Sequence, residues 1–325
     1  MVEYHVANVR VAGSNPVSRL NPPNPPFIKG EYFMKNLKEN LLELIRKTSA
    51  ELPGDVVRAV DHALEKETEG SQARYALEII RKNIDLANDK SQPLCQDTGA
   101  ILFYIESPKG FDQLLFEREA KKAVSLATKK GFLRQNSVDS LTGENSGTNL
   151  GPGTPTFHFH QTSKKETSIR LILKGGGCEN VGAQYSLPHT ALKADRDLEG
   201  VKKCILDAVL QAQGKGCGPG ILGVTIGGDR ATGYSFSKEQ FLRPLMDIHL
   251  NPTLARLEEE MVEKANRLGI GPMGFGGNTT LLGCKIGVLN RLPASYFVTV
   301  SYMCWAYRRQ GLVLTPQGKI KKWLY

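Results

Sequence analysis

Three of the six cysteines lie in loops or at the ends of predicted elements, where a thiolate can reach a metal. Cys95 lies between Pro93 and Gly99. Cys217 is flanked by glycines, and Cys304 follows an apolar run. Three soft ligands from three remote segments are a donor set that suits an iron–sulfur cluster. No two cysteines form a CxxC pair, so the sequence does not indicate a zinc ribbon.

The other three cysteines divide into two kinds. Cys204 recurs with apolar residues at helical spacing, and Cys284 lies inside an apolar run, so both are predicted to be core thiols. Cys178 directly follows three glycines and competes with the first set for a ligand role. The ligand set is therefore open at this point.

Composition excludes several classes of protein. The 325 residues have a net charge of +9, but Lys and Arg are mostly mixed with Asp and Glu, and no nucleic-acid-binding module is evident. No run of 18 apolar residues predicts a membrane span, and no secretory signal is evident. We therefore expect a soluble, cytoplasmic protein that binds neither nucleic acid nor membrane.

The apolar pattern changes along the chain. Residues 34–92 repeat apolar side chains every three or four positions, which predicts helices. Further helices are predicted at about 113–130, 200–213, 238–246 and 252–268, and strands at about 100–105, 156–160, 168–174, 221–226, 280–289 and 294–302. This order predicts an α/β mixed (α+β) fold, in which a helical N-terminal part precedes a mixed sheet flanked by helices.

Three regions are predicted. Residues 1–33 are rich in Asn and Pro without a helical or strand period, so we interpret them as disordered or as a mis-assigned extension, with Met34 as the true start. Residues 34–310 form the main domain. Residues 311–325 are interpreted as a basic C-terminal tail, or alternatively as a docking surface for an acidic partner. The polar segment 135–155 is a long loop of the length that tends to be functional.

Five segments, in order along residues 34–310, resemble class I, iron–sulfur-dependent fumarate hydratases and L(+)-tartrate dehydratases. The segments are Cys95–Gly99 (CQDTG), Lys174–Gly177 (KGGG), Cys217–Gly228, Gly274–Thr280 and Val300–Arg309. The resemblance implies a [4Fe–4S] cluster on Cys95, Cys217 and Cys304. It also implies that Asp97 takes part in proton transfer.

The same resemblance implies substrate-binding positions on both sides of these cysteines. They are Gln96, Arg134, Gly175, Gly176 and Gly177. Glycines expose backbone amides to an anion because no side chain blocks approach, and arginine pairs with carboxylates in a fork-like geometry.

The resemblance implies an alpha subunit that needs a separate beta subunit in a hetero-oligomer. Single-chain members carry a second domain, whereas only 15 residues follow position 310 here. The implied reaction is the hydration of fumarate, a small dicarboxylate of the tricarboxylic acid cycle, to L-malate. Dehydration of L(+)-tartrate is the alternative within the class.

One segment departs from the family pattern. The single-chain fumarases have an Arg-His pair shortly before the third cysteine, whereas this chain has Arg291-Leu292-Pro293. An acid/base role at that position is therefore not carried over. Two alternatives of other classes stay open: an electron-transfer or sensor protein in which Cys178 is a fourth ligand, and a metal-free scaffold.

Overall fold

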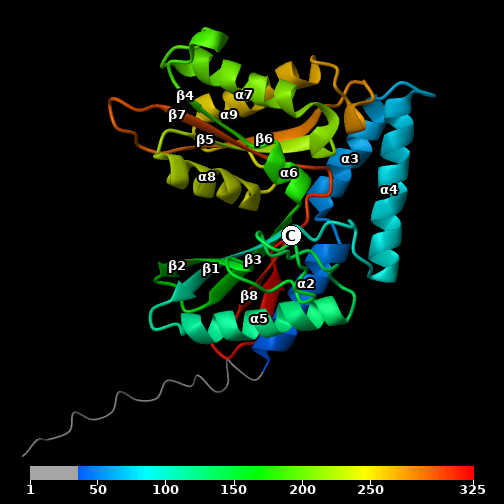
Figure 1. The fold of residues 1–325 in the computed structure, drawn as a ribbon, viewed down its shortest axis with the longest axis vertical. Helices are drawn as coiled ribbons and strands as arrows, with labels where there is room; N and C mark the ends of the chain where they lie inside the picture. The colour runs from blue at the N-terminus through cyan, green and yellow to red at the C-terminus, as the bar shows by residue number, and fades with distance from the viewer. Residues whose placement is uncertain (1–35) are drawn as a thin grey trace, which may run out of the picture.

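The chain folds into two halves, each built on its own mixed β-sheet (Figure 1). The computed structural model describes residues 36–325, so the predictions for residues 1–33 and for Met34 lie outside the described residues. The predicted α/β mixed class is confirmed. Within the described residues, no helix has both the length and the apolar character needed to cross a membrane.

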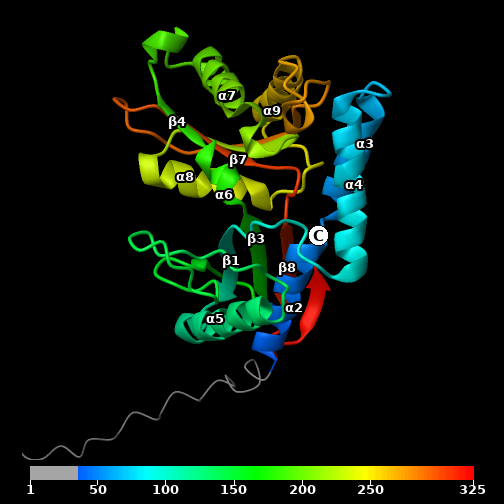
Figure 2. The same cartoon turned by 45° about the vertical axis from the view of Figure 1, so that its right-hand side comes forward.

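The predicted helical N-terminal part is confirmed as three helices, α2 (Leu37–Ala50), α3 (Gly54–Lys66) and α4 (Gln72–Lys90). The periodic apolar residues of α2 and α3 form their buried faces, with Leu41, Leu44 and Val60 fully buried. Figure 2 shows α3 and α4 side by side along one flank of both halves, while α2 lies against the first sheet.

The first sheet has the strand order β2 (Thr156–Thr162), β1 (Ala100–Pro108), β3 (Thr167–Lys174), β8 (Arg309–Leu314) and β9 (Ile320–Trp323). Only β1 and β2 pair in parallel; the other neighbours are antiparallel. One face packs against α2 and α5 (Gln113–Lys129) around a core that includes Phe103, Phe116 and Leu312.

The prediction of a basic tail at residues 311–325 is wrong. Residues Arg309–Leu314 form a strand between β3 and β9, and β9 completes the sheet edge. Leu312 and Leu314 are fully buried, so their burial, not the charge of the nearby lysines, determines the structure of this segment.

The second sheet has the strand order β4 (Ala183–Ser186), β7 (Phe297–Met303), β5 (Gly220–Ile226) and β6 (Leu281–Val288). Helices α7 (Leu198–Ala212) and α9 (Pro252–Asn266) cover its outer face, and α8 (Arg230–Glu239) lies on the side that faces the first sheet (Figure 1). Cys204 on α7 and Cys284 on β6 are buried, which confirms both as core thiols. Burial raises the pKa of Cys204 to about 12.

The helix predicted at 238–246 is wrong in its bounds, because α8 ends at Glu239 and a short 3₁₀ turn ends at Leu242. Proline disfavours a helical conformation in the residue before it. Arg243 precedes Pro244 and is accordingly extended, with φ −76° and ψ 142°. Asp229 begins α8 by accepting hydrogen bonds from the backbone N–H groups of residues 231 and 232.

Strand ends of both sheets meet between the two halves. Ala100 at the start of β1 pairs with Lys174 at the end of β3, and in the second sheet Ile221 pairs with Met303 at the end of β7. After β7 the chain crosses directly from the second sheet into β8 of the first sheet. The loops that carry the predicted chemistry therefore start from neighbouring points.

The Gly99→Ala variant tests how tightly these loops are packed. Gly99 has a φ of +75°, and a Cβ atom on it would lie 2.3 Å from the Lys174 carbonyl oxygen. Gly110 has a φ of +79° with no heavy atom within 4 Å, so it is the matched control. We expect Gly110→Ala to lower the free energy of unfolding by about 1–2 kcal/mol. Gly99→Ala should cost about 1–3 kcal/mol more because of the clash. Equal losses in urea unfolding would contradict this packing.

Candidate functional site

Four of the six thiols surround the point where the strand ends meet. Cys95 precedes β1, Cys217 precedes β5, and Cys304 directly follows β7. Cys178 lies on the short helix α6 (Gly176–Asn180) that follows β3. Cys217 is exposed, Cys95 is half-buried, and the other two thiols are buried. Three of the four are the predicted ligands, and the fourth is their predicted competitor.

Cys178 and Cys304 are in direct contact. The Cys304 thiol donates a hydrogen bond to Cys178, which, with the positive charge of Lys174 and against the effect of burial, lowers the pKa of Cys178 to about 7. The same hydrogen bond, together with burial, raises the pKa of Cys304. The two thiols therefore form a hydrogen-bonded pair within the site.

The backbone presents Cys217 in a left-handed conformation, with a φ of 54°. The Tyr302 ring packs against the loop, and a Cβ atom on Gly216 would lie 2.5 Å from it. The Trp305 N–H donates to the Cys217 carbonyl at 3.4 Å, which ties this loop to the segment that carries Cys304. Burial, followed by the charges of Cys178, Cys95 and Asp97, raises the pKa of Cys217, so these groups are close in space.

Asp97 is fixed on both of its carboxylate oxygens. The Gly176 N–H donates to Oδ2 at 2.6 Å, and the Asn136 side-chain amide donates to Oδ1 at 2.8 Å. Its own backbone N–H lies 3.5 Å from the Cys95 Sγ atom. The predicted glycine loop and the predicted carboxylate are therefore brought together beside the thiols.

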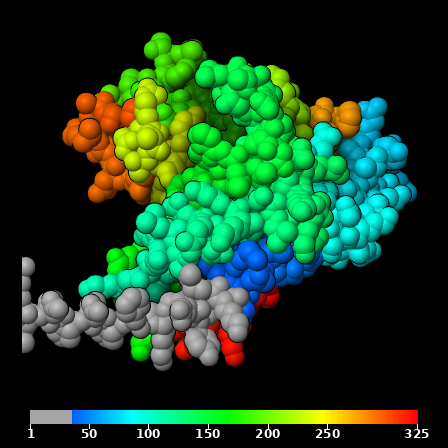
Figure 3. Space-filling view, turned by 60° about the horizontal axis from the view of Figure 1, so that its bottom comes forward, coloured from blue at the N-terminus to red at the C-terminus, as the bar shows by residue number. Residues whose placement is uncertain are grey.

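Asn136 was not predicted from the sequence. It lies 39 residues from Asp97, and the only signal for it was the length and polarity of the loop after Arg134. In the space-filling view of Figure 3, green surface of about residues 130–160 occupies the middle of this face, between the yellow surface of α8 and the cyan surface of α4.

Two buried side chains hold this loop in place. Thr98 exchanges hydrogen bonds with the backbone of Arg134, at 2.7 Å to its carbonyl and 3.0 Å from its N–H. Asn149 donates to the Arg134 carbonyl at 2.8 Å and accepts from the Asn136 N–H at 2.7 Å. The predicted substrate ligands Arg134 and Gln96 are exposed.

The predicted glycines differ in accessibility. Gly175 is buried, whereas Gly176 and Gly177 are exposed. A Cβ atom on Gly175 would lie 3.1 Å from the Asp97 Oδ2 atom and 3.8 Å from the Cys178 Sγ atom. The Asp97 carboxylate and the Cys178 thiol can therefore approach this part of the backbone so closely because Gly175 has no side chain.

The donor chemistry of the site fits an iron–sulfur cluster. Among residues 36–325, no group of three or more His, Cys, Asp or Glu side chains is arranged to hold a metal ion. A cubane cluster instead takes one thiolate for each iron, so its ligands stand apart at separate corners. Thiols carried by separate loops around one point match that requirement.

Comparisons with known proteins agree on one family. The model of the fumarate hydratase (Fumerase) family matches residues 38–313. A Geobacillus stearothermophilus protein named "Putative fumarate hydratase class I" is 53% identical over 296 residues, which cover 90% of this chain and 58% of that protein. The L(+)-tartrate dehydratase subunit alpha of Escherichia coli K12 is 32% identical over 284 residues, which cover 86% of this chain and 91% of that subunit.

Proposed function

The chain belongs to the fumarate hydratase (Fumerase) family, and on this basis we propose that it is the alpha subunit of a hydro-lyase that hydrates fumarate to L-malate. The observation that carries the proposal is the meeting of Asp97, the Gly176 N–H and the thiols of Cys95, Cys217 and Cys304 at one point. Identity of 53% to the Geobacillus protein supports fumarate as the substrate.

In this proposal Cys95, Cys217 and Cys304 hold a [4Fe–4S] cluster. When bound, the cluster supplies a Lewis acid at its one iron without a protein ligand, which polarises the oxygen atoms of the substrate. The exposed position of Cys217 and the partial exposure of Cys95 leave the outer side of the site accessible to a small molecule. The buried Cys304 fixes the inner side.

Asp97 is the proposed base that exchanges a proton with the substrate carbon adjacent to the carbon that bears the reacting hydroxyl. A carbon acid is weak, so the base must be held in good geometry. Asn136 and Gly176 supply that geometry because each fixes one carboxylate oxygen. Asn136 is therefore a proposed positioning residue, which acts through Asp97.

The dicarboxylate needs donors for its two charged ends. The exposed amide of Gly177 and the side chains of Gln96 and Arg134 are the proposed donors of this chain, whereas the Gly176 N–H already donates to Asp97. Thr98, the neighbour of Asp97, donates a hydrogen bond to the Arg134 carbonyl and so holds the backbone of Arg134 beside the site.

A beta subunit is proposed to complete the site in a hetero-oligomer. The chain spans 58% of the length of the Geobacillus relative, and the E. coli relative of similar length is named a subunit alpha. We also propose a cytoplasmic location, because all six cysteines are free, as is usual in a reducing compartment.

Two other functions are distinguished by specific observations. The E. coli relative supports L(+)-tartrate as an alternative substrate of the same site. An electron-transfer or sensor protein would use four ligands, and the contact of Cys178 with Cys304 makes Cys178 the candidate for the fourth. A Cys178→Ala variant that keeps the visible spectrum of the cluster would exclude that role.

The Cys217→Ser variant tests the ligand set. Without this thiolate the cluster loses one of three protein ligands, so we expect the iron and sulfide content of anaerobically purified protein to fall close to zero. Cys204→Ala is the matched control because Cys204 is fully buried on α7. The control should keep its iron, and a Cys217 variant with full iron content would refute the assignment.

The Asn136→Ala variant tests the positioning of Asp97. Loss of a hydrogen bond to a charged group costs about 1.5–3 kcal/mol, so kcat should fall about tenfold to hundredfold. The KM and the cluster spectrum should change little, since the Asn136 hydrogen bond reaches Asp97 and no cysteine. Ser140→Ala, an exposed change in the same loop, is the control. An unchanged kcat for Asn136→Ala would remove Asn136 from the mechanism.

Anaerobic co-expression with the candidate beta subunit tests the reaction itself. The complex should hydrate fumarate faster than it dehydrates either tartrate, and the purified chain alone should be inactive. Activity of the isolated chain would contradict the subunit proposal, and a preference for L(+)-tartrate would select the alternative substrate.

A further inference from the structure

Arg308 is a fully buried cation without a carboxylate partner. Its side chain is 1% exposed, and its Nε and Nη1 groups have no hydrogen-bond partner. Among the described residues, no Asp or Glu forms an ion pair with it. Burying an unpaired charge is strongly unfavourable, so a protein retains one where another group supplies the countercharge.

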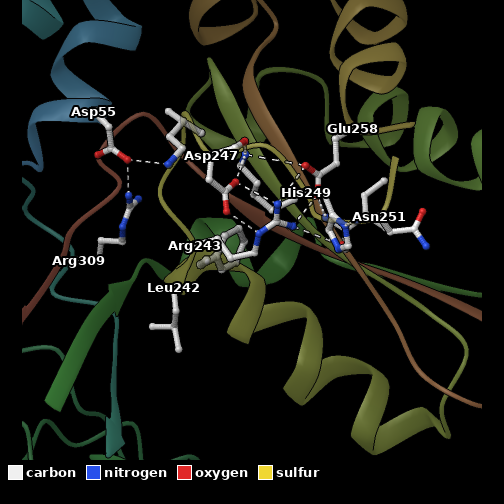
Figure 4. A network of polar contacts seen from close by, with 12 residues as sticks. Asp55, Leu242, Arg243, Asp247, His249, Asn251, Glu258 and Arg309 are labelled. Atoms are coloured by element: carbon white, nitrogen blue, oxygen red, sulfur yellow. Dashed lines mark hydrogen bonds and ion pairs between the residues drawn. The ribbon is translucent and has the colours of Figure 1, made fainter. Parts of the chain in front are cut away.

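The adjacent arginine shows the usual solution. Arg309 is also fully buried, but its guanidinium pairs with Asp55 at 2.5 Å (Figure 4). It also lies 4.2 Å from the centre of the Tyr307 ring. Asp55 accepts a second hydrogen bond from the Leu245 N–H at 2.6 Å, so this carboxylate joins α3, β8 and the loop before α9. The Nε and Nη1 groups of Arg309 also lack hydrogen-bond partners, but its charge is compensated by Asp55, whereas the charge of Arg308 has no carboxylate partner.

The position of Arg308 indicates what it faces. It lies four residues after Cys304, in the segment that crosses from β7 to β8. Its carbonyl accepts from the Leu173 N–H at 3.0 Å, which fixes the backbone next to the end of β3. Cys178 and Cys304 share one buried cluster with Ala306 and Tyr307, the two residues directly before Arg308, so the buried Arg308 lies next to the part of the core that contains both thiols.

The charged side chains near Cys178 also carry an excess of positive charge. Lys174 is also fully buried, 3.2 Å from Glu179, but Lys238 shares that carboxylate at 2.6 Å. Lys174 and Lys238 therefore share one glutamate, and Arg308 has no carboxylate partner among the described residues. An anionic group is needed there, and three thiolates outweigh the charge of a resting cubane core.

We infer that Arg308 is the built-in counterion of the cluster and that its Nε and Nη1 groups donate hydrogen bonds to the sulfur atoms of the bound cluster. The inference rests on the cluster of the proposed function. It assigns to Arg308 a role in holding and tuning the cofactor, since hydrogen bonds to sulfur and local charge set cluster stability and reduction potential. Arg308 forms no bond to iron in this account.

Three variants of the full chain test the inference: Arg308→Met, Arg308→Lys and, as the matched control, Arg309→Met. Each is purified anaerobically, and iron release to a chelator is timed by the loss of visible absorbance. The melting temperature is then measured after the cluster has been removed. The wild-type chain serves as the reference in both measurements.

Arg308→Met should release iron at least about tenfold faster than the wild type, with Arg308→Lys between the two, because the lysine keeps the charge but not the two separate donor nitrogens of the planar guanidinium. Without the cluster, Arg308→Met should melt at or above the wild-type temperature, because an uncompensated buried charge is gone. Arg309→Met should melt below it, because Asp55 loses its partner.

Iron release at the wild-type rate in either Arg308 variant would overturn the inference, as would a cluster-free Arg308→Met chain that melts as low as Arg309→Met. If Arg308→Met fails to fold, the release rate of Arg308→Lys decides. These outcomes are separate from failure of the proposed function, in which the wild-type chain itself would contain no iron or the complex would not hydrate fumarate.

Discussion

The strand ends of two separate sheets must meet at one point for this site to exist. Cys95 and Cys178 depend on β1 and β3 of the first sheet, and Cys217 and Cys304 depend on β5 and β7 of the second. No single sheet carries all four thiols. The positions of the four thiols therefore depend on strand register, namely on the pairing of Ala100 with Lys174 in the first sheet and of Ile221 with Met303 in the second.

The outer and inner sides of this site carry different charged and polar groups. The outer side offers exposed amides and an oriented carboxylate, whereas the inner side contains buried cations and a hydrogen-bonded pair of thiols. Buried cations without full compensation lower the stability of the chain, and the proposed anionic cluster would supply the missing compensation.

Local sequence patterns predicted much of the fold, because apolar periodicity directly reflects which face of a helix is buried. The helices of residues 37–90 and the strands that carry the first two cysteine motifs follow this rule. The failures had identifiable causes. Pro244 ended a predicted helix, and the lysines of residues 319–322 obscured a strand whose leucines are buried.

The family resemblance brought together Asp97, the glycine loop and the cysteines, but three features of the site depend on tertiary structure. Asn136 reaches Asp97 from a loop 39 residues away, and Cys178 contacts Cys304 across more than a hundred positions. Arg308 and Arg309 are identical neighbours in sequence, and only the fold shows that one is paired and the other is not. Sequence spacing carries no information about such partners.

The most direct test of the central claim is the Mössbauer spectrum of the complex, loaded with iron-57 under anaerobic conditions and recorded with and without fumarate. Three cysteine ligands leave one iron open to the substrate, so one component of the cubane spectrum should shift on addition of fumarate while the others stay constant. An active complex that contains no iron, or a cluster spectrum that fumarate leaves unchanged, would contradict the account.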